Sequence, residues 1–256
     1  MKELTENHWN YTKHAKFYEY RPNYAPKAID ALKEYVDAAK KEDFIVADIG
    51  AGTGNLSIML LERGLKTISV EPNDAMREIG IEKTQGQDIE WIRATGLETT
   101  LKDNSVDWVT FGSSFNVMDR DLALKEAHRI LKKDGYFSCM WNHRDLNDPI
   151  QKQAESIIEE FVPNYERGTR REDQRPIIEK NNNLFDEIFF MEVDFYFTQT
   201  IDTYILAWQS VKNKYWDLKT QEGVELFEKI TNKMRKELPQ KFNIKYSTRC
   251  WSAKKV

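Results

Sequence analysis

The fold is decided by the stretch Asp48-Ile49-Gly50-Ala51-Gly52-Thr53-Gly54-Asn55, which places three glycines between a short apolar run and a helical segment. Residues 44–49 read FIVADI, and residues 56–63 end before Gly64, so a strand, a tight turn and a helix are expected. Glycines let the backbone adopt positive φ and let a ligand lie directly against it. Because the loop opens onto a helix N-terminus, it indicates a site for an adenosine-like ligand.

The spacing of the glycines argues against two other nucleotide loops. The dinucleotide fingerprint G-x-G-x-x-G needs a third glycine where this chain has Asn55, which disfavours NAD. A Walker loop ends in Gly-Lys-Ser/Thr, whereas Gly54 is followed by Asn55 and Leu56, which excludes ATP by that route. The remaining alternative is an ordinary strand-to-helix turn.

Outside this loop, short apolar runs alternate with helical patterns. Further strands are expected over 66–70, 89–92, 106–111 and 136–141. Helices are expected over 26–39, 75–80 and 121–131. This alternation indicates βαβ units and a parallel sheet. Later in the chain, residues 187–197 and 244–254 alternate apolar and polar side chains with the period of a half-buried strand.

The expected fold class is Rossmann-like α/β. It consists of a doubly wound, mainly parallel seven-stranded sheet with an antiparallel edge strand and a helical cap from insertions in the second half. At 256 residues the chain suits one domain. The expected division is N-terminal lid helices over 1–43, a cofactor-binding core over 44–145, cap insertions over 146–186 and 198–243, and edge strands over 187–197 and 244–254.

Composition narrows the classes of partner. The formal net charge is −4, which disfavours a nucleic-acid substrate. No apolar run approaches the ~18 residues of a membrane span, and the polar N-terminus does not resemble a secretory leader, so a cytoplasmic location is expected. Cys139 and Cys250 are too far apart in sequence to indicate a disulfide framework or a zinc knuckle. A monomer or weak dimer is expected.

The histidines are not interpreted as metal ligands, and a cluster of arginines is interpreted as a surface segment. No metal is expected, because the histidines lack the spacing of metal ligands; they are His8, His14, His128 and His143. An arginine-rich segment is interpreted as a solvated loop, with contact to an acidic substrate or a nucleic acid as the alternative. Its members are Arg167, Arg170, Arg171 and Arg175.

The glycine stretch resembles the first motif of class I S-adenosylmethionine-dependent methyltransferases. The resemblance extends from Tyr18 to Asp145, about half of the chain. Glu71 is similar to the family's acidic residue that holds both ribose hydroxyls, and a carboxylate suits a diol. Residues 103–107 and the W-N-x-R-D of 141–145 resemble the small-molecule branch of trans-aconitate-type enzymes.

The resemblance also implies a cofactor site with S-adenosylmethionine as its ligand. The segment Tyr18–Tyr24 resembles a lid in which Arg21 meets the methionine carboxylate, with Tyr18 as a second contact. A surface role for Arg21 and for Glu71 is the alternative. The implied cofactor-binding residues are Tyr18, Arg21, Asp48, Gly50, Ala51, Gly52, Thr53, Gly54, Asn55, Glu71, Pro72, Met76, Ala94, Thr95, Gly96, Gly112 and Ser113.

The expected catalytic residues are Asn116 and Asp145. Asn116 stands where the resembling branch often has a histidine, and an asparagine cannot act as a base. Asp145 is a candidate carboxylate from the cap, as are Asp194 and Glu192. Because the sulfonium methyl is already activated, a base matters for a hydroxyl acceptor but not for a neutral amine or a carboxylate.

These features together predict an S-adenosylmethionine-dependent methyltransferase for a small molecule or short-peptide natural product. N-methylation is slightly favoured over O-methylation. Transfer to RNA or protein is the first alternative, although the chain lacks the Asp/Asn-Pro-Pro-Tyr/Phe element of enzymes that methylate nucleobases and glutamine. A cofactor-binding module without catalysis is the second.

Overall fold

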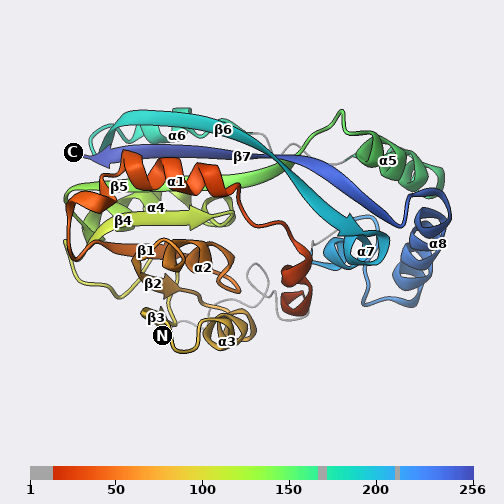
Figure 1. The fold of residues 1–256 in the computed structure, drawn as a ribbon, viewed down its shortest axis with the longest axis horizontal. Coiled ribbons are helices and arrows are strands. Elements are labelled where there is room, and N and C mark those ends of the chain that lie inside the picture. Colours follow the sequence, from red (N-terminus) through yellow and green to blue (C-terminus); the bar gives the residue numbers. More distant parts are fainter. Residues whose placement is uncertain (1–13, 167–171, 211–213) are drawn as a thin grey trace.

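A seven-stranded sheet forms the centre of the computed structural model, which describes residues 14–166, 172–210 and 214–256 (Figure 1). The strands are β1 (Ile45–Ile49), β2 (Lys66–Val70), β3 (Ile89–Ile92), β4 (Val106–Gly112), β5 (Leu131–Arg144), β6 (Phe185–Thr200) and β7 (Lys241–Lys255). Their order is β3-β2-β1-β4-β5-β7-β6. The first five strands are mutually parallel, and β7 runs antiparallel to both of its neighbours. The predicted fold class is confirmed, with the antiparallel strand one place in from the edge.

Helices follow the strands in the alternation that the sequence indicates. The α-helices are α1 (Pro26–Tyr35), α2 (Asn55–Leu61), α3 (Asp74–Lys83), α4 (Arg120–Ile130), α5 (Pro149–Phe161), α6 (Arg175–Lys180), α7 (Ile201–Gln209) and α8 (Gln221–Glu237). Three short 3₁₀ helices are η1 (Ala15–Tyr20), η2 (Ala38–Lys40) and η3 (Phe115–Val117). The helix expected over 26–39 ends early because Asp37 adopts a left-handed φ of 56°. None of the described helices is long and apolar enough to cross a membrane.

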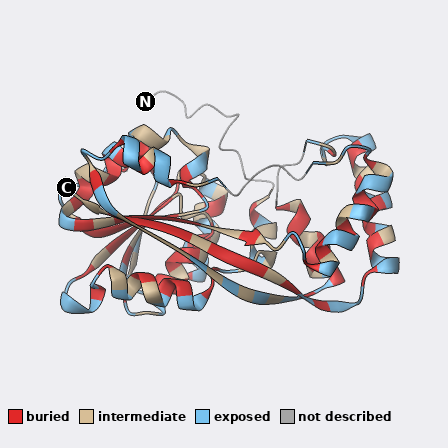
Figure 2. Ribbon diagram, turned by 90° about the horizontal axis from the view of Figure 1, so that it is seen from above, coloured by how far each residue is buried: buried red, intermediate tan, exposed pale blue. Residues whose placement is uncertain are grey.

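The two faces of the sheet bury separate apolar layers (Figure 2). One layer contains Phe111, Phe137 and Ile178, so α6 packs with α4 and β6 on the central sheet. The other layer contains Ile29 and Leu60, from α1 and α2. The sequence assigned α6 to the cap insertion over 146–186, whereas its buried isoleucine places it on the core.

Strands β6 and β7 continue past the end of β5 as a two-stranded ribbon. β5 pairs with β7 only as far as Arg144 opposite Tyr246, while β6 and β7 stay paired to Thr200 opposite Lys241. Helices α5, α7 and α8 gather at the end of this ribbon (Figure 1). They share a third apolar cluster that includes Ile158 from α5, and we call these three helices the cap.

Candidate functional site

The glycine loop connects β1 to α2 and is fastened to β2. Gly50 and Gly52 have φ values of 67° and 59°, in the left-handed region that favours glycine. The N–H groups of Gly50 and Ala51 donate to the carbonyl oxygen of Val70 at 2.8 and 3.1 Å. A Cβ on Gly50 would lie 2.6 Å from the Cβ of Ser114, so the loop also packs directly against the segment after β4.

Glu71 follows β2 and its carboxylate contacts the loop. The N–H of Gly52 donates to Oε2 at 2.8 Å, and the N–H of Asn73 donates to Oε1 at 2.8 Å. Burial raises the pKa of the Glu71 carboxyl, and these two hydrogen bonds partly offset the rise. Each oxygen keeps a further lone pair, so the carboxylate can still accept hydrogen bonds from a diol. The predicted ribose contact is supported by this geometry and stays a prediction.

Asp48 lies beneath the loop. Its carboxylate is fully buried and accepts hydrogen bonds from Ser57 Oγ at 2.7 Å and Thr110 Oγ1 at 3.2 Å. Burial raises the pKa of Asp48 to about 6, despite the lowering effect of both bonds. Asp48 therefore ties β1 to α2 and β4, and this is the role that its surroundings show.

Other predicted cofactor-binding residues border the same loop. The Met76 methyl carbon lies 3.3 Å from the position of a Cβ on Gly52. A Cβ on Gly96 would lie 2.7 Å from Met118 Sδ and 2.8 Å from Ile49 Cγ2, so Gly96 packs closely against the end of β1. The other predicted residues lie in the loop itself or beside these positions along the chain; they are Ala51, Thr53, Gly54, Asn55, Pro72, Ala94 and Thr95.

Gly112 and Ser113 contact Tyr24, which the sequence does not single out as a site residue. Tyr24 Oη lies 2.9 Å from Ser113 Oγ, and a Cβ on Gly112 would lie 2.9 Å from the same Oη atom. Burial raises the pKa of Tyr24 above its ordinary value. Ser113 itself has a φ of 59°, a left-handed conformation that non-glycine residues seldom adopt. The feature of the sequence that points to Tyr24 is its place as the last residue of the lid-like segment Tyr18–Tyr24.

The lid residues Tyr18 and Arg21 lie together and contact the cap. The guanidinium carbon of Arg21 is 4.2 Å from the centre of the Tyr18 ring. Arg21 donates from Nε to Ser210 Oγ at 2.8 Å and from Nη2 to the Ser210 carbonyl oxygen at 3.0 Å. His14 Nδ1 lies 2.7 Å from the carbonyl oxygen of Gln209. We call these contacts between η1 and the C-terminal end of α7 the latch.

Asn116 and Asp145, the two predicted catalytic residues, have different surroundings. Asn116 is exposed on η3, and its Oδ1 accepts a hydrogen bond from Trp141 Nε1 at 3.0 Å. Asp145 Oδ2 lies 3.4 Å from Lys245 Nζ, which is also 2.8 Å from Asp194 Oδ2. The structure shows no contact between Asn116 and Asp145, both of which lie in the described range 14–166. Their catalytic roles therefore stay predictions.

The remaining polar candidates show structural contacts. Glu192 pairs with Arg249 at 3.3 Å, and Arg175 donates from Nε to Asp173 Oδ2 at 2.8 Å. Within the ranges 14–166, 172–210 and 214–256, no three His, Cys, Asp or Glu side chains are grouped so as to hold a metal ion. His8, Arg167, Arg170 and Arg171 lie outside the described residues.

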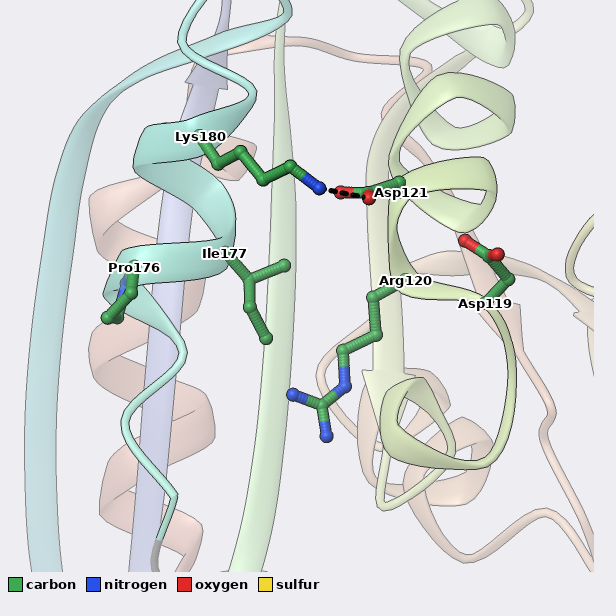
Figure 3. Close-up of a pocket in the computed structure, with 6 residues that line it drawn as sticks. All are labelled: Asp119, Arg120, Asp121, Pro176, Ile177 and Lys180. Carbon is green, nitrogen blue, oxygen red and sulfur yellow. Dashed lines mark hydrogen bonds and ion pairs between the residues drawn. The ribbon is translucent and has the colours of Figure 1, made fainter.

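A shallow hollow of about 370 Å³ lies between α4 and α6 (Figure 3). Asp119, Arg120 and Asp121 line it on one side, and Pro176, Ile177 and Lys180 on the other. Lys180 Nζ is 2.6 Å from Asp121 Oδ2, so these two opposite charges already form an ion pair across the hollow. It includes no residue of the glycine loop and not Glu71, and we do not assign the cofactor to it.

Comparison with known proteins identifies the part of the chain that contains this loop. Residues 47–139 match the methyltransferase domain family. The predicted class, a methyltransferase domain that uses S-adenosylmethionine, is therefore confirmed for this part of the chain. The narrower resemblance to trans-aconitate-type enzymes stays a prediction.

Two curated relatives are each similar to about half of this chain. An uncharacterized methyltransferase of Mycobacterium tuberculosis is 37% identical over 125 residues, which are 49% of this chain and 48% of that protein. A demethylmenaquinone methyltransferase of Staphylococcus aureus is 30% identical over 131 residues, which are 49% of this chain and 54% of that protein. The chain thus spans about half the length of the curated relatives it matches.

A solved structure extends the likeness of fold to the rest of the chain. The structure of a putative type II methyltransferase from Anaeromyxobacter dehalogenans has a TM-score of 0.55 at 13% sequence identity. The match covers 91% of this chain and 97% of that one. At this low identity the likeness concerns the fold alone.

The raised pKa of Asp48 predicts a pH-dependent stability. Its folded-state pKa of about 6 exceeds the ordinary value of 3.8, so the stability that Asp48 contributes is present at low pH and is lost as pH rises through about 6. Between pH 4.5 and pH 7 the loss is roughly 2 kcal/mol. The free energy of unfolding of Asp48→Asn, measured with urea, should lack this decline. Parallel pH profiles for the variant and the parent would contradict the prediction, and Asp43→Asn, at an exposed position before the same strand, is the control.

The loop also predicts a difference between two glycines. Gly52→Ala should weaken binding of S-adenosylhomocysteine by at least about tenfold, because a methyl group would intrude where the ligand approaches the backbone. Gly64 also has a positive φ, of 73°, but nothing lies within 4 Å of its Cβ position. Gly64→Ala should therefore keep the affinity of the parent, although both variants lose about 1 kcal/mol of stability. Calorimetry that finds equal affinities for the two variants would show that the loop is only a turn.

Proposed function

We propose that the protein is an S-adenosylmethionine-dependent methyltransferase for a small molecule or a short peptide, with an amine as the favoured acceptor. The observation that carries the proposal is the carboxylate of Glu71, which is held against the N–H of Gly52 at the carboxyl end of β2. Ligands of parallel α/β sheets bind at the carboxyl ends of the strands. The methyltransferase domain matched over residues 47–139 contains both of these residues.

Three features support a small acceptor. The latch joins η1 to α7 through Arg21 and Ser210, which brings the cap against the lid segment. The formal net charge of −4 opposes binding of a phosphate backbone. The relative from Staphylococcus aureus is named for a small-molecule substrate, demethylmenaquinone. A role in natural-product biosynthesis, a cytoplasmic location and a monomeric or weakly dimeric state stay predictions from the sequence.

Transfer to an amine is favoured by the surroundings of the candidate bases. Asn116 has no titratable group, and its amide oxygen is bonded to Trp141. Asp145 and Asp194 lie 3.4 Å and 2.8 Å from the ammonium group of Lys245, so both carboxylates are already paired with a cation. A hydroxyl acceptor would need a base in the transition state, whereas a neutral amine would not. Transfer to RNA or protein, and a module that binds cofactor without catalysis, are the alternatives.

Glu71→Ala tests the cofactor assignment. The variant should bind S-adenosylhomocysteine about 1.5–3 kcal/mol more weakly than the parent, because it loses an ionised hydrogen-bond acceptor. Isothermal titration calorimetry measures this loss, and NAD should give no heat of binding with the parent. Glu82→Ala, at an exposed position on α3, is the control. Tighter binding of NAD, or an unchanged affinity in Glu71→Ala, would refute the assignment.

Asn116→Ala tests the absence of an enzymic base. Once fractions of a metabolite extract that convert the cofactor to S-adenosylhomocysteine have supplied an acceptor, the variant should lose less than the ~10²–10⁴-fold that removal of a general base costs. The pH profile of kcat/KM in both proteins should follow the titration of the acceptor. A hydroxyl-methylated product, with a rate limb that belongs to a protein group, would rule this mechanism out.

A further inference from the structure

Two of the arginines that the structure describes have no carboxylate partner among the described residues. Most described arginines pair with a carboxylate within 4 Å; they are Arg63, Arg77, Arg93, Arg120, Arg129, Arg175, Arg235 and Arg249. Among the residues that the structure describes, Arg21 and Arg144 are the exceptions, and both contact α7. Arg21 already has a role in the latch, so Arg144 is the arginine without an assigned function.

Arg144 lies at the end of β5 that adjoins the candidate site. Asn142, two residues earlier on the same face of the strand, donates to the carbonyl oxygens of Pro22 and Asn23 in the lid segment. Trp141 donates to Asn116 on η3. Arg144 therefore lies about 7 Å further along the strand from a residue that contacts the lid.

Aromatic rings surround the guanidinium of Arg144. Its Cζ atom is 5.3 Å from the ring centre of Tyr204, 5.0 Å from that of Trp208 and 6.0 Å from that of Tyr246. The side chain is half-buried, so it is partly withdrawn from water without being sealed. Aromatic rings attract a cation, but they leave its N–H groups without hydrogen-bond acceptors.

The hydrogen bonds of Arg144 use only neutral acceptors. Nε donates to Tyr246 Oη at 2.9 Å, and Nη1 donates to Gln151 Oε1 at 3.3 Å. Nη2 has no acceptor among the described residues. The nearby carboxylates have other partners: Asp145 lies by Lys245, and Asp148 accepts from the N–H groups of Gln151 and Lys245. The outer edge of the guanidinium is therefore available to an anion.

We infer that Arg144 binds an anionic oxygen group, a carboxylate or a phosphate, carried by the methyl acceptor. The planar fork of a guanidinium suits both groups, and withdrawal from water strengthens the attraction. The aromatic rings would pack against the carbon skeleton beside the anion. This inference rests on the proposed function only in assigning the anion to the acceptor, because binding of an anion at Arg144 can be measured without methyl transfer.

Simple anions test the site. Thermal denaturation of the full-length protein, with and without saturating S-adenosylhomocysteine, is followed in sodium benzoate, benzamide, potassium phosphate and potassium chloride, with the salts at equal ionic strength. Benzoate or phosphate should raise the Tm of the parent, and benzamide and chloride should not. In Arg144→Met the apparent Kd of the stabilising anion should rise about 10- to 100-fold.

Two further variants separate the anion site from packing. Arg144→Lys keeps the charge without the fork and should give an intermediate Kd, and it replaces the Met variant if that protein does not fold. Arg249 also stacks on rings, 5.3 Å from the centre of Phe190 and 4.8 Å from that of Trp251, but it is paired with Glu192. Arg249→Met should keep the response of the parent to anions.

Each outcome decides the inference. Stabilisation by benzoate alone assigns a carboxylate, and stabilisation by phosphate alone assigns a phosphate. An equal effect of benzamide, no anion effect in the parent, or the same effect in Arg144→Met would overturn it. If S-adenosylhomocysteine itself fails to raise the Tm, the proposed function fails while the anion measurement without cofactor still decides the role of Arg144.

Discussion

The candidate site depends on the way in which the end of β2 fixes the glycine loop. The carbonyl oxygen of Val70 accepts hydrogen bonds from the N–H groups of Gly50 and Ala51, and the carboxylate of Glu71 accepts one from Gly52. Three consecutive N–H groups of the loop are thus held by two consecutive residues of a neighbouring strand. Only a parallel β1–β2 pair in the observed register, with Ile49 opposite Val70, brings these groups together.

Beneath this loop, a buried polar network makes the same arrangement specific. Ser69 on β2 donates to Ser57 on α2, which donates to Asp48, and Thr110 on β4 also donates to Asp48. Burying a carboxylate is costly, which is why the pKa of Asp48 rises to about 6. Every hydrogen bond of the network joins two different elements. A change in register would leave a buried polar group unsatisfied, so the network favours one arrangement of the core.

The sequence predicts the parts of this structure that local patterns determine. The strands over 66–70 and 89–92 agree with β2 and β3 because turns bound each apolar run closely. The sequence does not single out Tyr24 or Arg144 as site residues, because their hydrogen-bond partners Ser113 and Tyr246 lie 89 and 102 residues away in sequence. The sequence predicts the short helix α6 as part of the cap, because nothing in its six residues shows that Ile178 contacts the core. Such contacts follow from the topology of the sheet, which single-sequence periodicity does not report.

Overall charge and local charge lead to different conclusions about the substrate. The net charge of −4 describes the whole surface that a long polyanion would meet, and it opposes such a partner. Arg21, in contrast, donates to Ser210 at the end of α7, and Arg144 lies against the Trp208 ring of the same helix. Neither arginine pairs with a carboxylate among the described residues. Screening confines the effect of the surface charges to about 8 Å at physiological salt, whereas a partly buried guanidinium is screened less. For a small anion between the lid and the cap, attraction to the two arginines would therefore exceed repulsion by the acidic surface. A negative net charge of the protein is thus compatible with a small anionic acceptor.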